Sequence, residues 1–208
     1  RYRFEHPPEF AVEGVIAGRG QTGQTDLQLA FRSDRPAATE LLDRDWTFDQ
    51  VTGRVAFRGG DTTVHVEGGL LGGDVILDIA VVDGIVSGNL LGQGLDFDDV
   101  VQVAGGTEER GGAVDLQMNF KTRENRDEWF DAAGTATVAD ADIFAIPVLG
   151  PLSPLISGVL PGENRVGYGV ANSATMDFSI NRGVLSTESF EALTQTFRLG
   201  AKGQIDLK

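Results

Sequence analysis

The chain of 208 residues has no cysteine, two histidines, and 17 lysines and arginines against 31 aspartates and glutamates. The absence of cysteine excludes disulfide scaffolds, zinc knuckles and thiol catalysis. The net charge of −14 argues against nucleic-acid binding, because contacts to phosphate need clustered lysine and arginine side chains. The same acidity disfavours simple electrostatic attraction to anionic lipid head groups.

A clean transmembrane segment and a signal peptide are missing as well. The longest apolar stretch, Ile143 to Leu160, is interrupted by three prolines and two glycines, whereas a spanning helix needs about 20 consecutive apolar residues. The sequence starts at Arg1 without a targeting segment. We interpret it as one β-rich domain, residues 1–208, cut from a longer chain.

Apolar and polar residues alternate with a period of two along most of the chain. In one clear run, Val75, Leu77 and Ile79 alternate with Asp74 and Asp78. This pattern is typical of antiparallel strands that have one dry and one wet face. Asp-Gly and Gly-Gly-Asp turns, which favour tight hairpins, separate many of the runs. We therefore predict a mainly β fold, a long curved antiparallel meander of about ten to thirteen strands that forms a groove or an open sandwich.

Three segments depart from the alternation. Residues 35–45 (RPAATELLDRD) are compatible with a short helix, and residues 96–103 begin with acids that suit the first turn of another. Residues 143–161 carry no charge and predict one or two short apolar helices near 143–160, interrupted by proline. Such a segment is either ordinary core or a helix that plugs, gates or lines an apolar groove or touches a membrane.

Equipment for catalysis is scarce. The chain has no nucleophile elbow, phosphate-binding loop or zinc-protease motif. His65 falls on the polar side of an alternating strand, where a solvent-facing role is expected. The acidic cluster at residues 96–99 and the pair Asp140 and Asp142 are expected to cap helices or face solvent rather than to bind metal. We predict a protein that is not an enzyme and has no cofactor and no metal site.

Several Gly-containing motifs follow one another along the chain, and in the run 134–152 (GTATVADADIFAIPVLGPL) a strand pattern is followed by an Asp-containing turn and an apolar Pro-Leu segment. The type and order of these motifs resemble those of the AsmA-like family of bacterial envelope proteins. Residues 174–180, 183–188 and 199–207 are similar to its closing strands. The resemblance extends over about residues 47–208, with departures at Ala132-Ala133 and in the proline-rich apolar segment.

The resemblance implies a long sheet curved into a groove with an apolar inner face. AsmA-like proteins lie in the envelope of diderm bacteria and are usually anchored in the inner membrane, and they are thought to conduct phospholipid towards the outer membrane. By resemblance, this chain is expected in the periplasm, anchored through a segment outside it. Its expected partners are a phospholipid or another acyl lipid and envelope proteins, with no nucleic acid.

Two hypotheses follow from these observations. In the first, the chain is a lipid-binding or lipid-conducting β-groove module. The residues predicted to line the groove are Val75, Leu77, Ile79, Leu116, Met118, Phe120, Phe178, Ile180 and Leu199, and those predicted to gate it are Ile146, Leu149, Leu152 and Ile156. In the second, the same alternation builds a closed β-sandwich with a structural or carbohydrate-binding role. Few aromatic residues besides phenylalanine are present to stack on sugars.

Overall fold

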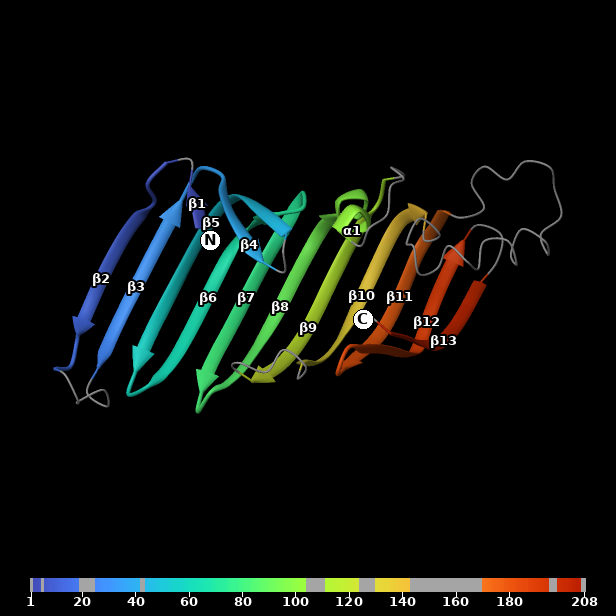
Figure 1. The fold of residues 1–208 in the computed structure, drawn as a ribbon. Helices are drawn as coiled ribbons and strands as arrows, with labels where there is room; N and C mark the ends of the chain where they lie inside the picture. The colour runs from blue at the N-terminus through green and yellow to red at the C-terminus, as the bar shows by residue number, and fades with distance from the viewer. Residues whose placement is uncertain are drawn as a thin grey trace.

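The computed structural model describes residues 2–4, 6–18, 25–41, 44–103, 111–123, 130–142, 170–194 and 198–206 (Figure 1). Thirteen strands in this part of the chain join into one sheet, and every pairing between them is antiparallel. The strands are β1 (Tyr2–Phe4), β2 (Glu9–Val15), β3 (Asp26–Ser33), β4 (Ala37–Leu41), β5 (Arg44–Arg58), β6 (Asp61–Leu70), β7 (Gly73–Val82), β8 (Ile85–Asp96), β9 (Ala113–Arg123), β10 (Phe130–Asp142), β11 (Val170–Asn181), β12 (Val184–Thr194) and β13 (Arg198–Asp206).

From β5 to β13 each strand pairs with the next one along the chain, so the sheet is a simple meander. The N-terminal end is different, because β3 and β4 both pair with the same long strand. β3 lies against residues 51–58 of β5, and β4 lies against residues 44–48. β2 then adds to β3, and β1 adds to β4.

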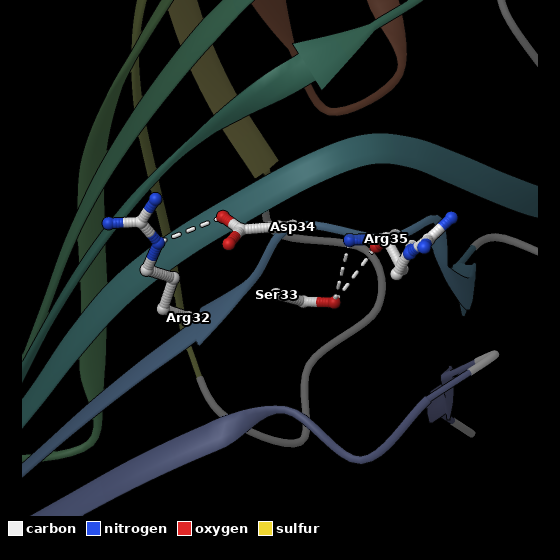
Figure 2. Close-up of polar contacts among 4 residues, drawn as sticks. All are labelled: Arg32, Ser33, Asp34 and Arg35. Atoms are coloured by element: carbon white, nitrogen blue, oxygen red, sulfur yellow. Dashed lines mark hydrogen bonds and ion pairs between the residues drawn. The ribbon is translucent and has the colours of Figure 1, made fainter.

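A tight turn lets the chain pass from β3 to β4 along β5 (Figure 2). The buried Ser33 hydroxyl donates to the carbonyl of Arg35 at 2.8 Å and accepts from its backbone N–H at 3.4 Å. Arg32 Nε donates to Asp34 Oδ1 at 2.8 Å on the exposed side. A serine that bonds its own backbone two residues on is a standard turn device, and here its polar group is satisfied although it is buried.

Left-handed residues shape the hairpins in the meander. Asp83 and Gly84 between β7 and β8 have φ of 51° and 69°. Arg182 and Gly183 between β11 and β12 have φ of 50° and 83°. Two consecutive positive φ angles define the loop whose twist matches that of paired strands, so the hairpin expected at the Asp-Gly pair is confirmed.

The predicted fold class is confirmed, since the described strands form one long, open antiparallel meander. The helix expected at residues 96–103 is also found, as α1 (Phe97–Val103). The helix expected at residues 35–45 is wrong, because β4 and the start of β5 pair there from Ala37 to Phe48. Pairing with a long neighbouring strand overrides the helical propensity of alanine, leucine and glutamate. The helices expected near 143–160 lie outside the described residues.

Close packing is concentrated where α1 meets the sheet. Phe97 and Val101 are 1% and 0% exposed, and they pack with buried residues of β7, β8, β9 and β10. Figure 1 places α1 at one end of β8 and β9. A smaller buried cluster, Ala174, Phe190 and Ala192, joins β11 to β12. Within the described ranges no helix is long and apolar enough to cross a membrane.

Candidate functional site

One face of the sheet is apolar from strand to strand. Leu77 lies opposite Leu90 and Val66, and Leu90 lies opposite Met118. Gly134 and Phe178 continue the same row on β10 and β11. Because residues directly opposite each other point to the same side of a sheet, this row and its neighbours two residues away form a single surface. We call it the apolar face, and its members include Val55, Val64, Val66, Val75, Leu77, Ile79, Leu90, Leu116, Met118, Phe120, Phe178, Ile180 and Leu199.

The nine residues predicted to line a groove all lie on this apolar face. Val75 and Phe178 are buried, with 8% and 9% exposure. The other seven are only partly buried, although their side chains are large and apolar. A residue in a filled core is normally almost fully removed from water. The face is therefore left largely uncovered by the described residues.

α1 closes one end of the apolar face. Its side chains Phe97 and Val101 pack on Val75, Leu95 and Val114. Asp96 fixes the start of the helix, since its Oδ1 accepts the backbone N–H groups of Asp98 at 2.9 Å and Asp99 at 3.2 Å. The helix-capping role predicted for the acidic cluster is therefore confirmed for Asp96. α1 therefore covers the apolar face at one end of the strands β7, β8 and β9, and it does not cover the middle of these strands.

Phenylalanine rings lie over glycines on the apolar face. Phe31 is opposite Gly53, Phe120 is opposite Gly88, and Phe178 is opposite Gly134. A β-carbon built on Gly53 would lie 2.3 Å from the Phe31 ring, and one on Gly88 would lie 2.5 Å from that of Phe120. The phenylalanine rings therefore occupy the space above the glycines, which have no side chains of their own.

A hollow formed by described residues lies on the opposite, polar face. It has a volume of about 1,230 Å³ and runs from β2 to β11. Two neighbouring rows of polar-face residues line it. The apolar residues that also contact the hollow, such as Ile79 and Phe120, alternate with these two rows along the strands. The next apolar row, with Leu77 and Met118, does not take part. The groove expected by resemblance had an apolar inner face, whereas most residues that line this hollow come from the polar face, and they expose both polar and apolar atoms.

A ladder of polar side chains crosses the floor of the hollow. Arg54, His65, Asp78, Asn89 and Asn119 lie opposite one another on five consecutive strands. Amide groups and charges of both signs therefore line this surface, and the hydroxyl groups of Thr63, Ser87 and Ser179 also line the hollow. Asp131 Oδ1 in the same hollow is buried and accepts no hydrogen bond from the described residues.

His65 bridges two carboxylates on this ladder. Its Nδ1 lies 2.7 Å from Asp78 Oδ1, and its Nε2 lies 2.8 Å from Glu67 Oε1. Both hydrogen bonds, that of Asp78 first, raise the pKa of His65 above its ordinary value. The expected solvent-facing position is confirmed, since the side chain is 42% exposed. No group of three His, Asp or Glu side chains in the described ranges is arranged to hold a metal ion.

The remaining predicted residues lie elsewhere. The proposed gate, Ile146, Leu149, Leu152 and Ile156, falls outside the described residues. Asp140 lies near the end of β10 with φ of 52°. The signal that sequence reasoning did not use is the small size of the polar-face residues: Ala30, Ala56, Ala80 and Ala133 all line the hollow.

No protein-family model matches the chain, and comparisons with curated proteins and with solved structures give no match either. Membership of the AsmA-like family therefore stays a prediction based on the order of short motifs.

Proposed function

We propose that the chain is a non-enzymatic module whose apolar face binds the acyl chains of a phospholipid or another acyl lipid. The observation that carries the proposal is the apolar face, which the described residues leave largely uncovered and on which seven of nine predicted lining residues are only partly buried. By resemblance to AsmA-like proteins, the module would act in the periplasm, anchored to the inner membrane through a segment outside the chain. There it would conduct lipid between the inner and outer membranes.

The extent of the exposed surface supports this proposal. The chain exposes 13,654 Å² to solvent, whereas a compact protein of 22.2 kDa would expose roughly 9,400 Å². An open single-layer sheet contributes to this surface, because within the described ranges no second layer covers either of its faces. Large apolar surfaces that remain exposed are typical of binding sites for apolar partners.

The dimensions of the apolar face suit acyl chains. Seven strands lie between β5 and β11 inclusive, and a spacing of about 4.8 Å gives an apolar strip about 29 Å long. One leaflet of a bilayer has a hydrocarbon depth of about 15 Å, so an extended acyl chain fits along the strip. Each methylene removed from water contributes about 0.8 kcal/mol.

The acidity of the chain does not oppose this mode of binding. The acidic and basic side chains of β6, β7 and β9, such as His65, Asp78 and Lys121, lie on the polar face. An acyl chain on the apolar face meets Val, Leu, Met and Phe side chains instead. Head groups would extend beyond the apolar strip into water.

Photo-crosslinking tests the proposal. The purified chain is incubated with phosphatidylethanolamine that carries a diazirine on one acyl chain, and the labelled peptides are identified by mass spectrometry. We expect labels on β7, β8 and β9, because these strands form the middle of the apolar face. Lipids extracted from the protein as purified provide a second, probe-free measurement.

A matched pair of variants makes the test specific. Met118→Glu places a carboxylate on the apolar face, and Asn119→Glu places one on the polar face of the same strand. Burying an unpaired charge among acyl chains is costly, so Met118→Glu should lose about tenfold or more of the labelling while Asn119→Glu keeps it. Equal labelling of the two variants, or no labelling of the unaltered chain, would overturn the proposal. Circular dichroism checks that both variants fold.

Carbohydrate binding is the second candidate. The closed β-sandwich that this function was predicted to use is not found, since all described strands belong to one open sheet. The polar hollow, with paired Asn89 and Asn119 and the unpartnered Asp131 Oδ1, offers groups that bind sugar hydroxyls. Glycan-array binding that is lost in Asn119→Ala would favour this function, and an array without signal would remove it. Of the aromatic residues besides phenylalanine that could stack on a sugar, Trp129 and Tyr168 lie outside the described residues, whereas Tyr2 lies on β1 and Trp46 on β5.

A further inference from the structure

The described sheet ends in β1 and β2 at its N-terminal end and in β13 at its other end, and the edges formed by β2 and β13 differ. β2 pairs only with β3, and β13 pairs only with β12. An edge strand presents unpaired N–H and C=O groups to any strand that approaches, and natural proteins usually protect such edges with charges or irregular backbone.

β13 shows this protection. Its exposed residues include Arg198, Lys202 and Asp206, and two glycines, Gly200 and Gly203, interrupt it. None of the exposed large hydrophobic residues in the described ranges lies on β13. This edge therefore offers little apolar contact to a partner strand.

β2 differs from β13 in its exposed large apolar side chains, which lie between the exposed charges Glu9 and Glu13 and beyond them. Phe10 and Val12 are each 59% exposed, and Val15 is 63% exposed. Ile16, directly after the strand, is 75% exposed. These four account for more than half of the seven exposed large hydrophobic residues in the described part of the chain. An edge with this many exposed apolar side chains is the kind of surface that pairs with another strand, and its charges, Glu9 and Glu13, restrict the register of the pairing.

The faces of β2 restrict what its partner can be. Phe10 and Val12 lie opposite Phe31 and Leu29, so they belong to the side that carries the apolar face. Glu13 lies opposite Gln28 on the polar face. A matching strand must present apolar residues on one side and must place no acid beside Glu13 on the other.

We propose that a second copy of this chain provides that strand, through antiparallel β2–β2 pairing with Val12 opposite Val12. In this register Ala11 lies opposite Glu13, and Glu9 lies opposite Val15. A register centred on Ala11 would place Glu9 opposite Glu13, and one centred on Glu13 would place that glutamate opposite itself. Like charges directly opposite each other destabilise strand pairs, which disfavours those two registers. Val12 is the midpoint of Glu9–Val15, so the Val12 register also pairs the whole strand.

The same register reproduces a contact that the sheet already uses three times. It places Phe10 opposite Gly14 of the other copy, as Phe31, Phe120 and Phe178 are placed opposite glycines within the chain. Gly14 has φ of 128°, a conformation that excludes larger residues at this position. The apolar face then continues without a break from one copy to the other.

Sedimentation equilibrium of the purified chain tests the dimer. Two copies of charge −14 repel, and salt screens this repulsion, so we expect dimers whose fraction rises from 20 mM to 300 mM NaCl. Val12→Lys and Val12→Glu should each be monomeric, because each places two like charges opposite each other. An equal mixture of the two variants should recover a dimer. Leu193→Lys, at a residue 51% exposed on β12, is the matched control and should behave as the unaltered chain.

Cysteine substitution tests the register, because the chain has no cysteine of its own. Residues directly opposite each other in a sheet are close enough for a disulfide. With copper phenanthroline as the oxidant, Val12→Cys should form a covalent dimer at least tenfold faster than Ala11→Cys or Leu193→Cys. A chain that is monomeric at all salt concentrations, or variants of Val12 that still dimerise, would overturn the proposal. Faster crosslinking of Ala11→Cys would overturn the register.

Discussion

Two phenylalanines on the same side of the sheet provide a direct test of which part of it is covered. Phe97 on α1 is 1% exposed and contacts the buried cluster around Val75 and Val114. Phe120 on β9 lies on the apolar face, is only partly buried, and stacks on Phe130 with ring centroids 6.1 Å apart. The perturbation is the same in both cases, truncation to alanine, so the difference in stability loss reports on the surroundings.

The structure gives different magnitudes for the two truncations. Phe97→Ala removes a fully enclosed ring and leaves a cavity, which costs about 3–5 kcal/mol. Phe120→Ala removes a ring that still faces water on one side and loses one aromatic pair, so we expect about 1–2 kcal/mol. A domain of ordinary stability has about 5–15 kcal/mol in total, so the first change is severe and the second is tolerable.

Urea denaturation followed by tryptophan fluorescence measures both losses, with the slope of the transition checked for each variant. A loss in the free energy of unfolding for Phe120→Ala as large as that for Phe97→Ala would contradict this expectation. That result would mean that the apolar face is covered and packed like a core. It would remove the main support for lipid binding at the same time.

Three further predictions concern single positions. Gly88→Ala should lose about 1–3 kcal/mol in urea denaturation, because its β-carbon would lie 2.4 Å from the carbonyl oxygen of Asp78, whereas Gly203→Ala has open space and should lose little. Asp96→Ala should lose about 1 kcal/mol with its helix cap, and Asp96→Asn should keep most of it. Since the pKa of His65 is raised on folding, its bonds to Asp78 and Glu67 stabilise the protein fully below the unfolded pKa of about 6.5, and this contribution is lost as the pH rises through the folded pKa. In an NMR titration, His65 should titrate above pH 6.5 and Asp78→Asn should bring its pKa down, and an unshifted His65 would contradict the assignment.

The strands were predictable because strict alternation and left-handed turn residues determine them locally. The run from Val75 to Ile79 and the Asp83-Gly84 turn needed no knowledge of distant residues. Residues 35–45 were not predictable in this way, because their helical composition is overridden by pairing with β5, and that pairing depends on the length of a strand further along the chain. β3 and β4 pair with different halves of the same edge of β5, and no local sequence pattern predicts this arrangement.

The apolar surface was predictable as a set, since alternation alone places Val75, Met118 and Ile180 on one side. The alternation cannot show whether a second layer covers that side, because a sheet with a packed core on one face and a sheet with that face open have the same sequence pattern. The hollow was missed for a related reason. It depends on the curvature of the sheet, for which small residues such as Ala56 and Ala80 on the polar face are only a weak indication.

An uncovered apolar face also has a thermodynamic consequence, because a ligand that binds only the folded state stabilises it. At a lipid concentration 100 times the dissociation constant, the gain is about 2.7 kcal/mol. Amides of β6 to β9 that exchange only by global unfolding should therefore exchange about 100-fold more slowly when phospholipid is added.

The same exchange experiment separates binding on the apolar face from binding in the polar hollow. Met118→Glu should abolish the slowing by phospholipid, since its carboxylate lies where acyl chains would pack, while Asn119→Glu should retain it. If the two variants respond in the opposite way, the lipid occupies the hollow, and the polar ladder from Arg54 to Asn119 rather than the apolar face is the binding surface.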